Sequence, residues 1–387
     1  MLFELLQVAL GRRETLSRVP SEREWWMLYQ ESMRQAVAGI AFAGADRLMV
    51  HDSRFMVNMP FQLKMEWIGL TEQIKQQNKH VDKQTAEIWN RLKDDGLEAA
   101  ILKGQGIATL YDVRCKREDV RSESIETTDS LALLRQSGDI DIWVKGGYEK
   151  VCDYVQRTHP TDDVAYHRFH YDYFKDTEVE LHHRPTLMRN LFDDRKLAKW
   201  YNAFDPDSFV YLEDKGFAVP PVEFNRIFIL THIYRHFLFE GIGLRQVMDY
   251  YFVLRNTNHT NITNSSCHTE IAESTERLLK DLRLTRFAEA MMWVLYTQLG
   301  LEEQYLICGM NEKEGRFVLD EILQTGNFGQ GDSRYRYKRW FKLRHHIAHG
   351  SHLLMHYPSE VIWTPIWLVY HKVWKWNKKR KIRKIWK

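Results

Sequence analysis

The spacing of apolar positions divides the chain into helical ends and an extended middle. Residues 1–95 repeat their apolar side chains at helical spacing. Within this region one long pattern runs over about 61–93 and stops at Gly96, a typical helix-ending signal. Helical periodicity returns at about Val222. We therefore expect helical regions on both sides of a different central segment.

The central segment alternates between apolar and polar positions. Residues 98–102 predict a short buried strand, followed by the glycine-containing turn 103–106 and a helix. Residues 139–144 alternate strictly and predict a second strand. Residues 166–175 and 178–183 alternate on either side of a polar turn, which favours a β-hairpin. The segment predicts a small β-sheet.

Together these patterns predict an α+β protein in which a small mixed sheet is flanked by N-terminal and C-terminal helical regions. We divide the 387 residues into a helical region at 1–96, an α+β domain at 97–220, a helical domain at 221–370 and a tail at 371–387. Residues 112–137 are polar and aperiodic and predict an inserted loop.

Charge is distributed unevenly along the chain. The net charge is only +3, yet nine of the 55 Lys and Arg residues lie in the last seventeen positions, which contain no acid. The rest of the chain is therefore mildly acidic. An apolar content of 44% and few prolines exclude collagen-like and wholly disordered classes.

Nothing in the sequence indicates export or membrane spanning. Glu4 stands where a secretory signal would carry a base, and no run of 18 apolar residues lacks a charge. Cys115, Cys152, Cys267 and Cys308 form no paired motif, so neither a disulfide framework nor a structural zinc site is expected. We expect a cytoplasmic protein.

Two carboxylates carry the most informative chemistry. Side chains alternate on a strand, so Asp139 and Asp141 share one face while Ile140 and Ile142 enter the core. Adjacent carboxylates repel each other, and a divalent cation with hard oxygen ligands, such as Mg²⁺, relieves that repulsion. The alternative is an exposed edge strand with two solvated acids.

A third acid strengthens the metal interpretation. Glu180 and His182 share one face of a following strand, and Glu178 on the same face is an alternative to Glu180. Three carboxylates suit a two-metal phosphoryl-transfer site, in which one of them can take the proton of an attacking hydroxyl. Upstream, the turn at Gly104 exposes backbone N–H groups to phosphate oxygens, and Lys103 adds a positive charge.

These segments resemble a known family in an ordered series of matches. The segments are Ile101-Leu-Lys-Gly104, Arg135-Gln-Ser-Gly-Asp-Ile-Asp141, Val179-Glu-Leu-His182, His232-Ile-Tyr-Arg-His236 with Gly241-Ile-Gly-Leu-Arg245, and Gly326-Asn-Phe-Gly329. Over roughly residues 60–330 the chain resembles the uncharacterised bacterial nucleotidyltransferase family of the DNA polymerase β-like nucleotidyltransferase superfamily.

The resemblance implies roles for these residues. Asp139 and Asp141 would bind the Mg²⁺ or Mn²⁺ ions that carry a nucleoside triphosphate, and Glu180 would be the third catalytic and metal-binding carboxylate. The superfamily usually follows its turn glycine with Gly or Ser, and this chain has Gln at that position. The residues expected to bind the nucleotide are Lys103, Gly104, Gln105 and Arg245.

The expected function is metal-dependent transfer of a nucleoside monophosphate from a triphosphate to an unknown acceptor, with release of pyrophosphate. The resemblance ranks a sugar-phosphate or glycan-related acceptor first. The alternative is a catalytically degenerate nucleotide-binding or scaffold protein at the membrane surface, with a possible link to surface polysaccharide synthesis. Phosphoester hydrolysis would use the same carboxylates. No DNA partner is expected.

Four other polar residues leave two interpretations open. Arg245 and Asp249 are four residues apart, so they can pair on one helix, or Arg245 can contact phosphate. His232 and His236 have the same spacing and can face a cleft or serve as hydrogen-bonded structural histidines.

The basic tail interleaves bases with Trp374, Trp376, Ile382, Ile385 and Trp386. On a helix this pattern suits an anionic membrane surface at the inner face of the membrane. Trp363 and Trp367 extend the interfacial pattern. A solvated terminus and single-stranded nucleic acid are the alternatives.

Overall fold

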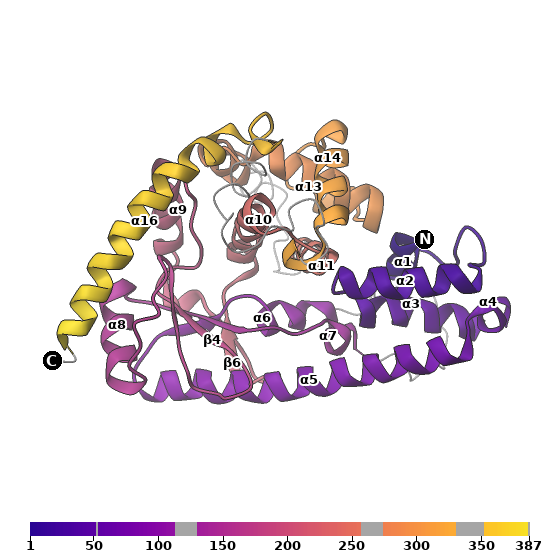
Figure 1. Ribbon diagram of the computed structural model, residues 1–387, viewed down its shortest axis with the longest axis horizontal. Coiled ribbons are helices and arrows are strands. Elements are labelled where there is room, and N and C mark those ends of the chain that lie inside the picture. The colour runs from indigo at the N-terminus through magenta and orange to yellow at the C-terminus, as the bar shows by residue number, and fades with distance from the viewer. Residues whose placement is uncertain (52, 113–129, 257–273, 330–351, 386–387) are drawn as a thin grey trace, which may run out of the picture.

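The computed structural model describes residues 1–51, 53–112, 130–256, 274–329 and 352–385. Its helices surround two small β-sheets, which confirms the predicted α+β class (Figure 1). Helices of the described ranges are α1 (Leu2–Ala9), α2 (Glu22–Arg34), α3 (Ala38–His51), α4 (Ser53–Asn58), α5 (Phe61–Asp94), α6 (Gln105–Ala108), α7 (Leu131–Leu134), α8 (Gly147–Thr158), α9 (Leu191–Asn202), α10 (Val222–Phe239), α11 (Leu244–Arg255), α13 (Thr285–Leu299), α14 (Glu312–Thr325) and α16 (Pro358–Ile385). The strands are β1 (Ala99–Ile101), β2 (Ile140–Val144), β3 (Arg168–His170), β4 (Val179–His182), β5 (Val210–Leu212) and β6 (Phe217–Val219).

The four-stranded sheet has the order β1-β2-β4-β3. Its central strands β2 and β4 run parallel, and β1 and β3 pair with them antiparallel. The predicted hairpin is confirmed as β3 and β4, although both strands are shorter than the alternating patterns. Because β2 has a neighbour on each side, the edge-strand alternative for the acid-bearing strand is wrong.

The long helix predicted over 61–93 is confirmed as α5, which runs along the sheet (Figure 1). The chain turns at Gly96, whose φ of +78° is a conformation that favours glycine. Near that end the indole of Trp89 donates a hydrogen bond of 2.8 Å to the carbonyl of Ala99 in β1. The contact ties the helix to the edge of the sheet.

Buried apolar side chains form two clusters. One contains the apolar face of the four-stranded sheet, together with β6, α8 and the second half of α5. The other joins α1–α3 and the first half of α5 to α10, α11, α13 and α14. The N-terminal and C-terminal helices thus share one core, and the predicted division at 96/97, 220/221 and 370/371 stays a prediction.

Part of the predicted loop at 112–137 is helical. Residues 131–134 form α7, in which Ala132 and Leu134 are buried, whereas 113–129 lie outside the described residues. A Cβ atom on Gly39 of α3 would lie 2.4 Å from the carbonyl oxygen of Leu134. Helix α7 is thus packed closely against α3. Such a contact between distant segments cannot be read from the local periodicity of the sequence.

The basic tail continues a helix. α16 runs without interruption from Pro358 to Ile385, across the predicted boundary at 370/371, and lies beside α8 and α9 (Figure 1). Lys378 lies 3.1 Å from Glu149 of α8, and Arg383 lies 2.7 Å from Asp162. Among the helices of the described ranges, none is long and apolar enough to cross a bilayer.

Candidate functional site

The candidate site is built on the parallel pair β2–β4. Their register places Asp141 directly opposite Glu180. Ile140 and Ile142 alternate with Asp141 and enter the core, so burial of the apolar face fixes which side the acid occupies. Asp141 and Glu180 are both buried, so they converge inside the protein and not on its rim.

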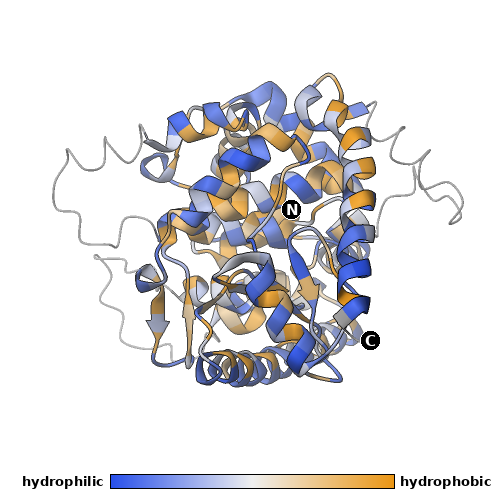
Figure 2. Ribbon diagram, turned by 90° about the vertical axis from the view of Figure 1, so that its left-hand side faces the viewer, coloured by the Kyte–Doolittle hydropathy of each residue, from blue (hydrophilic) through white to orange (hydrophobic). Residues whose placement is uncertain are grey.

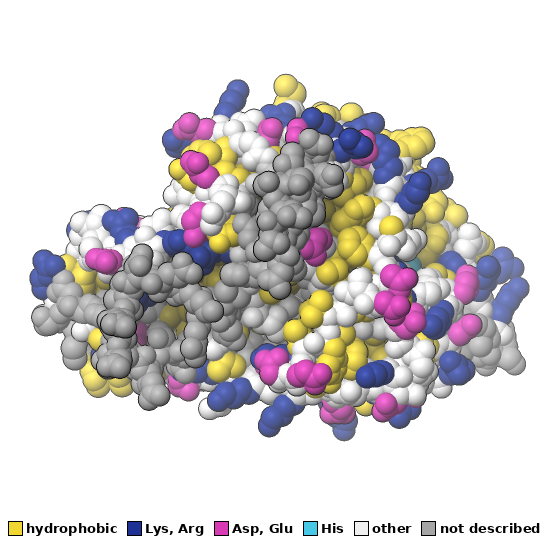
Figure 3. All heavy atoms as spheres, turned by 180° about the vertical axis from the view of Figure 1, so that it is seen from behind, with side chains coloured by type: hydrophobic (Ala, Val, Ile, Leu, Met, Phe, Trp, Pro, Cys, Tyr) yellow, Lys and Arg dark blue, Asp and Glu magenta, His cyan; other side chains and the backbone are white. Residues whose placement is uncertain are grey.

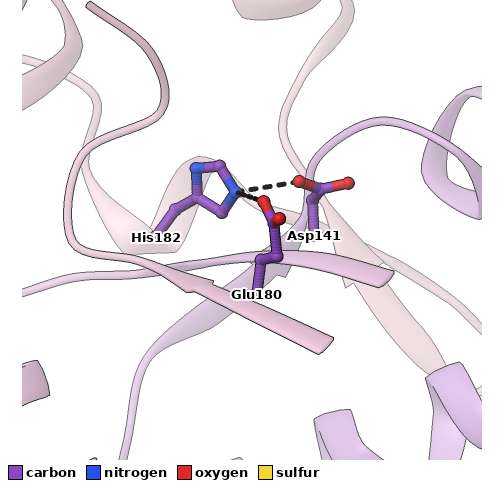
Figure 4. A group of neighbouring side chains, drawn as sticks. All are labelled: Asp141, Glu180 and His182. Carbon is purple, nitrogen blue, oxygen red and sulfur yellow. Dashed lines mark hydrogen bonds and ion pairs between the residues drawn. The ribbon is translucent and has the colours of Figure 1, made fainter. Parts of the chain in front are cut away.

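His182 joins these two acids. Its Nε2 lies 2.8 Å from Asp141 Oδ1 and 3.3 Å from Glu180 Oε2 (Figure 4). One ligand atom from each of the three side chains lies within 4.8 Å of the others, a spacing suited to one metal ion. The three groups therefore form a compact acid–histidine cluster.

Asp139 and Lys103 lie next to the cluster. Asp139 precedes β2 and is about one-third exposed, whereas Lys103 follows β1. The Lys103 ammonium lies 3.1 Å from Asp141 Oδ2 and 3.4 Å from Asp139 Oδ2. Lys103 thus bridges the two carboxylates that were expected to share a metal ion.

The hairpin separates the two candidates for the third acid. Glu180 is buried and forms an ion pair with Arg168 of β3. Glu178 is 54% exposed and lies 3.2 Å from His170 Nδ1. The structure therefore brings Glu180, and not Glu178, to Asp141.

Burial and the neighbouring charges together shift the pKa values of the four groups at the site. Burial favours a neutral Asp141, but Lys103 and His182 outweigh it and lower the pKa of Asp141. Burial raises the pKa of Glu180, and the charge of Asp141 adds to the effect. Burial also opposes charge on Lys103 and on His182, yet the adjacent carboxylates raise the pKa of both cations.

A narrow polar pocket adjoins the cluster. Four of the five segments that carry the resemblance line it, through Lys103, Gly104, Asp139, His232, Arg245 and Phe328, whereas the segment 179–182 does not. A Cβ atom on Gly329, whose φ is +68°, would lie 2.5 Å from the carbonyl oxygen of Glu240. This close approach packs the Phe328 turn against the end of α10.

Arg245 reaches the pocket from α11. It donates hydrogen bonds of 3.1 Å to the carbonyl of Gln136 and 3.5 Å to that of Ser137. Burial lowers the pKa of Arg245, and the nearby charge of Arg135 lowers it further. Its buried Nε has no hydrogen-bond partner among the described residues.

Asp249 pairs with a different arginine. Arg135 bonds both of its carboxylate oxygens, at 2.6 and 2.8 Å, and the Tyr111 hydroxyl donates a third bond of 2.7 Å. The predicted pairing of Arg245 with Asp249 on one helix is therefore wrong. The Arg135–Asp249 pair instead fixes the segment before β2 to α11 and forms one wall of the pocket.

The two histidines of α10 differ. His236 forms hydrogen bonds with Glu240 at 2.6 Å and with Arg235 at 2.7 Å. It is therefore a hydrogen-bonded structural histidine, one of the two interpretations of its spacing. His232 instead lines the pocket, as the interpretation of a cleft-facing histidine predicts. Burial lowers the pKa of His232 well below its usual range, and the charges of His236 and Lys103 add to the effect.

Gln105 is buried at the start of α6 and its amide donates to Asp82 of α5. Gly104 has a φ of +60°, and a Cβ atom there would lie 3.4 Å from the carbonyl oxygen of Asp139. The turn therefore approaches the acid-bearing strand closely. A role of Gln105 or Gly104 in nucleotide binding stays a prediction.

The sequence analysis missed Arg168 as a partner of Glu180. The hairpin prediction contained a usable signal, because register across β3–β4 brings residues 168–170 beside 180–182. The sequence analysis also assigned Lys103 only to phosphate binding. It missed the ion pairs of Lys103 with Asp139 and Asp141.

Residues 131–295 match the model of a protein family described as uncharacterised nucleotidyltransferase. No curated protein and no solved structure gives a significant match. The matched segment is shorter than the expected 60–330, but it contains Asp139, Asp141, Glu180, His182 and Arg245. It supports nucleotidyl transfer as the class of reaction.

Proposed function

We propose that this protein transfers a nucleoside monophosphate from a nucleoside triphosphate to an acceptor and releases pyrophosphate, in a reaction that depends on a divalent metal. One observation carries the proposal. The buried acid cluster of Asp141 and Glu180 is joined through Lys103 to a pocket that Lys103, Asp139 and Arg245 line, within and beside the segment that matches a nucleotidyltransferase family.

Asp139, Asp141 and Glu180 would hold the metal, with Mg²⁺ or Mn²⁺ as the ion. The donor set fits, because Asp141 Oδ2 is buried without a hydrogen bond among the described residues and has only the Lys103 ion pair. A bound ion of this kind neutralises phosphate charge and activates oxygen nucleophiles. Lys103 competes with such an ion for oxygens of Asp139 and Asp141, and His182 Nε2 would be a further ligand in the same cluster.

The triphosphate occupies the polar pocket in this proposal. Lys103 and Arg245 neutralise phosphate oxygens there, and the Gly104 turn and Gln105 border the phosphates. Phe328, whose ring lies 5.8 Å from the Arg245 guanidinium, limits the pocket on the far side. Arg245 is held by two carbonyls that a phosphate group can replace as acceptors.

The acceptor oxygen attacks the α-phosphorus while the bond from that phosphorus to the β-phosphate oxygen breaks, and pyrophosphate leaves. Glu180 takes the acceptor proton, a role that fits its raised pKa, because burial favours its protonated form. A sugar-phosphate or another glycan-related hydroxyl or phosphate is the first acceptor class to test.

A second candidate is a nucleotide-binding module without catalysis. The observation in its favour is that the carboxylates already have cationic partners within the protein. Lys103 bridges Asp139 and Asp141, and Arg168 pairs with Glu180. Such a module would bind a triphosphate and release no pyrophosphate.

The test is incubation of the purified full chain with α-labelled triphosphates, Mg²⁺ or Mn²⁺, and an extract that supplies acceptors. We expect pyrophosphate release and a labelled acceptor, and we expect Asp141→Asn to reduce both by at least about a hundredfold. Glu178→Gln, an exposed acid of the same hairpin, is the matched control and should retain activity.

Each other outcome identifies an alternative. Labelled monophosphate without a labelled acceptor indicates phosphoester hydrolysis. Triphosphate binding without turnover indicates the non-catalytic module. Absence of both binding and turnover for every triphosphate contradicts the proposed function.

A further inference from the structure

The outer face of α16 is apolar over residues 362–376, about half of the length of the helix. Five side chains recur there at intervals of three or four residues, and each is between 50% and 65% exposed: Ile362, Ile366, Val369, Val373 and Trp376. We call these residues the α16 stripe. At a helical rise of about 1.5 Å per residue the stripe is about 21 Å long.

The stripe continues as a basic segment. One turn beyond Trp376 the same face carries Arg380, and one turn further Lys384. Neither base forms an ion pair with an acid in the described part of the chain. No acid follows Glu360 in the sequence, so the outer face is purely cationic at this end.

The opposite face of α16 binds the protein. Trp374 packs edge-on against Tyr148 and Tyr166, and Ile382 is buried in the sheet cluster. Bases on this side pair with acids of the body, as Lys378 does with Glu149. These contacts fix which side of the helix remains outside.

The position of the helix leaves this side accessible. α16 runs down one edge of the molecule to the C-terminus (Figures 1 and 2). In Figure 2 it carries apolar residues on its upper turns and becomes mainly hydrophilic towards its C-terminal end. On the face seen in Figure 3, acidic and basic side chains are interspersed.

We propose that α16 docks lengthwise on an anionic lipid bilayer. The stripe enters the boundary between headgroups and acyl chains, Trp376 lies at headgroup depth, and Arg380 and Lys384 contact anionic headgroups. The sequence pattern of the tail suggested a membrane surface. The structure changes the contact residues, because Trp374 and Ile382 face the protein and the stripe begins further upstream.

Charge argues against a second copy of this chain as the occupant. A symmetric pair would bring the same face of each copy together, and that face offers no acid to Arg380 or Lys384 of its partner. An anionic bilayer supplies both the apolar layer and the negative charge. The inference does not depend on the proposed nucleotidyl transfer.

The test is sedimentation of the full chain with vesicles of phosphatidylcholine alone or mixed with phosphatidylglycerol. We expect strong binding to the anionic mixture at about 0.1 M salt and weaker binding at about 1 M, where charge is screened within about 3 Å. Ile366→Gln/Val373→Gln should lower the vesicle affinity more than about tenfold at both salt concentrations. Arg380→Glu/Lys384→Glu should lower it about tenfold or more at low salt only.

Two matched controls share these chemical changes elsewhere on the surface. Met27→Gln/Met33→Gln removes two exposed apolar side chains of α2, and Lys79→Glu/Lys83→Glu makes the same charge change on α5. Both should bind as the parent does. Equal loss in the controls, or a parent that stays in solution with anionic vesicles, overturns the proposal. Sedimentation equilibrium provides a further test. If Ile366→Gln/Val373→Gln abolishes self-association of the chain but still binds vesicles as the parent does, a second copy occupies the stripe and the proposal is overturned.

Discussion

Asp141 and Glu180 face each other directly across the parallel strands β2 and β4, and His182 Nε2 lies within hydrogen-bond distance of both. Register fixes this relationship, because a slip of one residue would turn either acid into the apolar core. The acid pair is therefore a consequence of how the sheet folds. Of the three carboxylates proposed to hold an ion, Asp141 and Glu180 are therefore positioned by strands, and Asp139 directly precedes β2.

The pair predicts a difference between two neighbouring glutamates. Glu180→Gln should weaken Mn²⁺ binding about tenfold or more, because it removes a buried charge beside Asp141. Glu178→Gln should change it less than about twofold, because Glu178 is exposed and lies beside His170. Titration of the electron paramagnetic resonance signal of free Mn²⁺ measures both affinities without any substrate.

Asp141→Asn should behave as Glu180→Gln does in the same titration. If Glu178→Gln weakened Mn²⁺ binding more than Glu180→Gln, the cluster in Figure 4 would not be the metal site. Equal Mn²⁺ affinity in all of these variants would contradict a metal site on this hairpin.

The Lys103 bridge predicts a link between metal and stability. Lys103→Met leaves Asp139 and Asp141 without their shared cation, and loss of one partner from a buried ion pair costs about 3–5 kcal/mol. We expect the Tm of the variant to fall by several degrees. Added Mn²⁺ should restore more of the Tm in Lys103→Met than it adds to the parent, because the ion replaces the ammonium.

Differential scanning fluorimetry with and without Mn²⁺ measures this difference. Lys79→Met, which removes an exposed base of α5, is the control and should match the parent in both conditions. A low Tm in Lys103→Met that Mn²⁺ leaves unchanged would show that the bridge and the metal do not share a position.

Local patterns were sufficient to predict the four strands of the larger sheet and its acids, but not the two-stranded sheet of β5 and β6. Alternation around Asp141 gave both the strand and the face that its acid occupies, and the hairpin pattern brought Glu180 to the neighbouring strand. The long helix α5 was predicted almost to the residue, because its period and its stop at Gly96 are encoded within it. The expected match to an uncharacterised nucleotidyltransferase family was confirmed over a shorter segment, and the superfamily stays a prediction.

Contacts between distant segments could not be predicted in the same way. Arg135 and Asp249 are 114 residues apart, and helix spacing instead suggested the wrong partner, Arg245. The amide of Gln105 bonds Asp82 across 23 residues for an equally non-local reason. Pairing of this kind depends on how α5 and α11 pack around the sheet, which no local period records.

The Arg135–Asp249 pair predicts a specific pattern of stability. Asp249→Asn should lower the free energy of unfolding by about 3–5 kcal/mol, since it leaves the buried Arg135 guanidinium without a counter-charge and weakens the bond from Tyr111. Asp207→Asn, an exposed acid, should change it by less than about 0.5 kcal/mol. Urea unfolding measures both.

The double variant Arg135→Met/Asp249→Leu separates pairing from packing. Because the double variant removes both charges, it should be more stable than Arg135→Met alone and more stable than Asp249→Leu alone. Additive losses from the two single substitutions would show that the two groups act independently and would contradict the pair as the support of the pocket wall.

His236 predicts how stability depends on pH. Burial lowers its pKa to about 4, and the nearby charge of Arg235 contributes, whereas the unfolded chain titrates near 6.5. Between these values the unfolded state binds more protons than the folded state, so stability is complete above about pH 6.5 and falls as pH decreases towards 4. Linkage gives a loss of about 2–3 kcal/mol from this group by pH 4.5.

His236→Gln should remove that part of the pH dependence, because a glutamine amide can still donate to Glu240 and accept from Arg235 without titrating. His80→Gln, at a half-exposed position on α5, should leave it in place. Urea unfolding at a series of pH values from 7.5 to 4.5, roughly the range over which histidine titrates, measures both slopes. A parental slope in His236→Gln would assign the acid sensitivity to other buried histidines, such as His232, whose pKa burial also lowers.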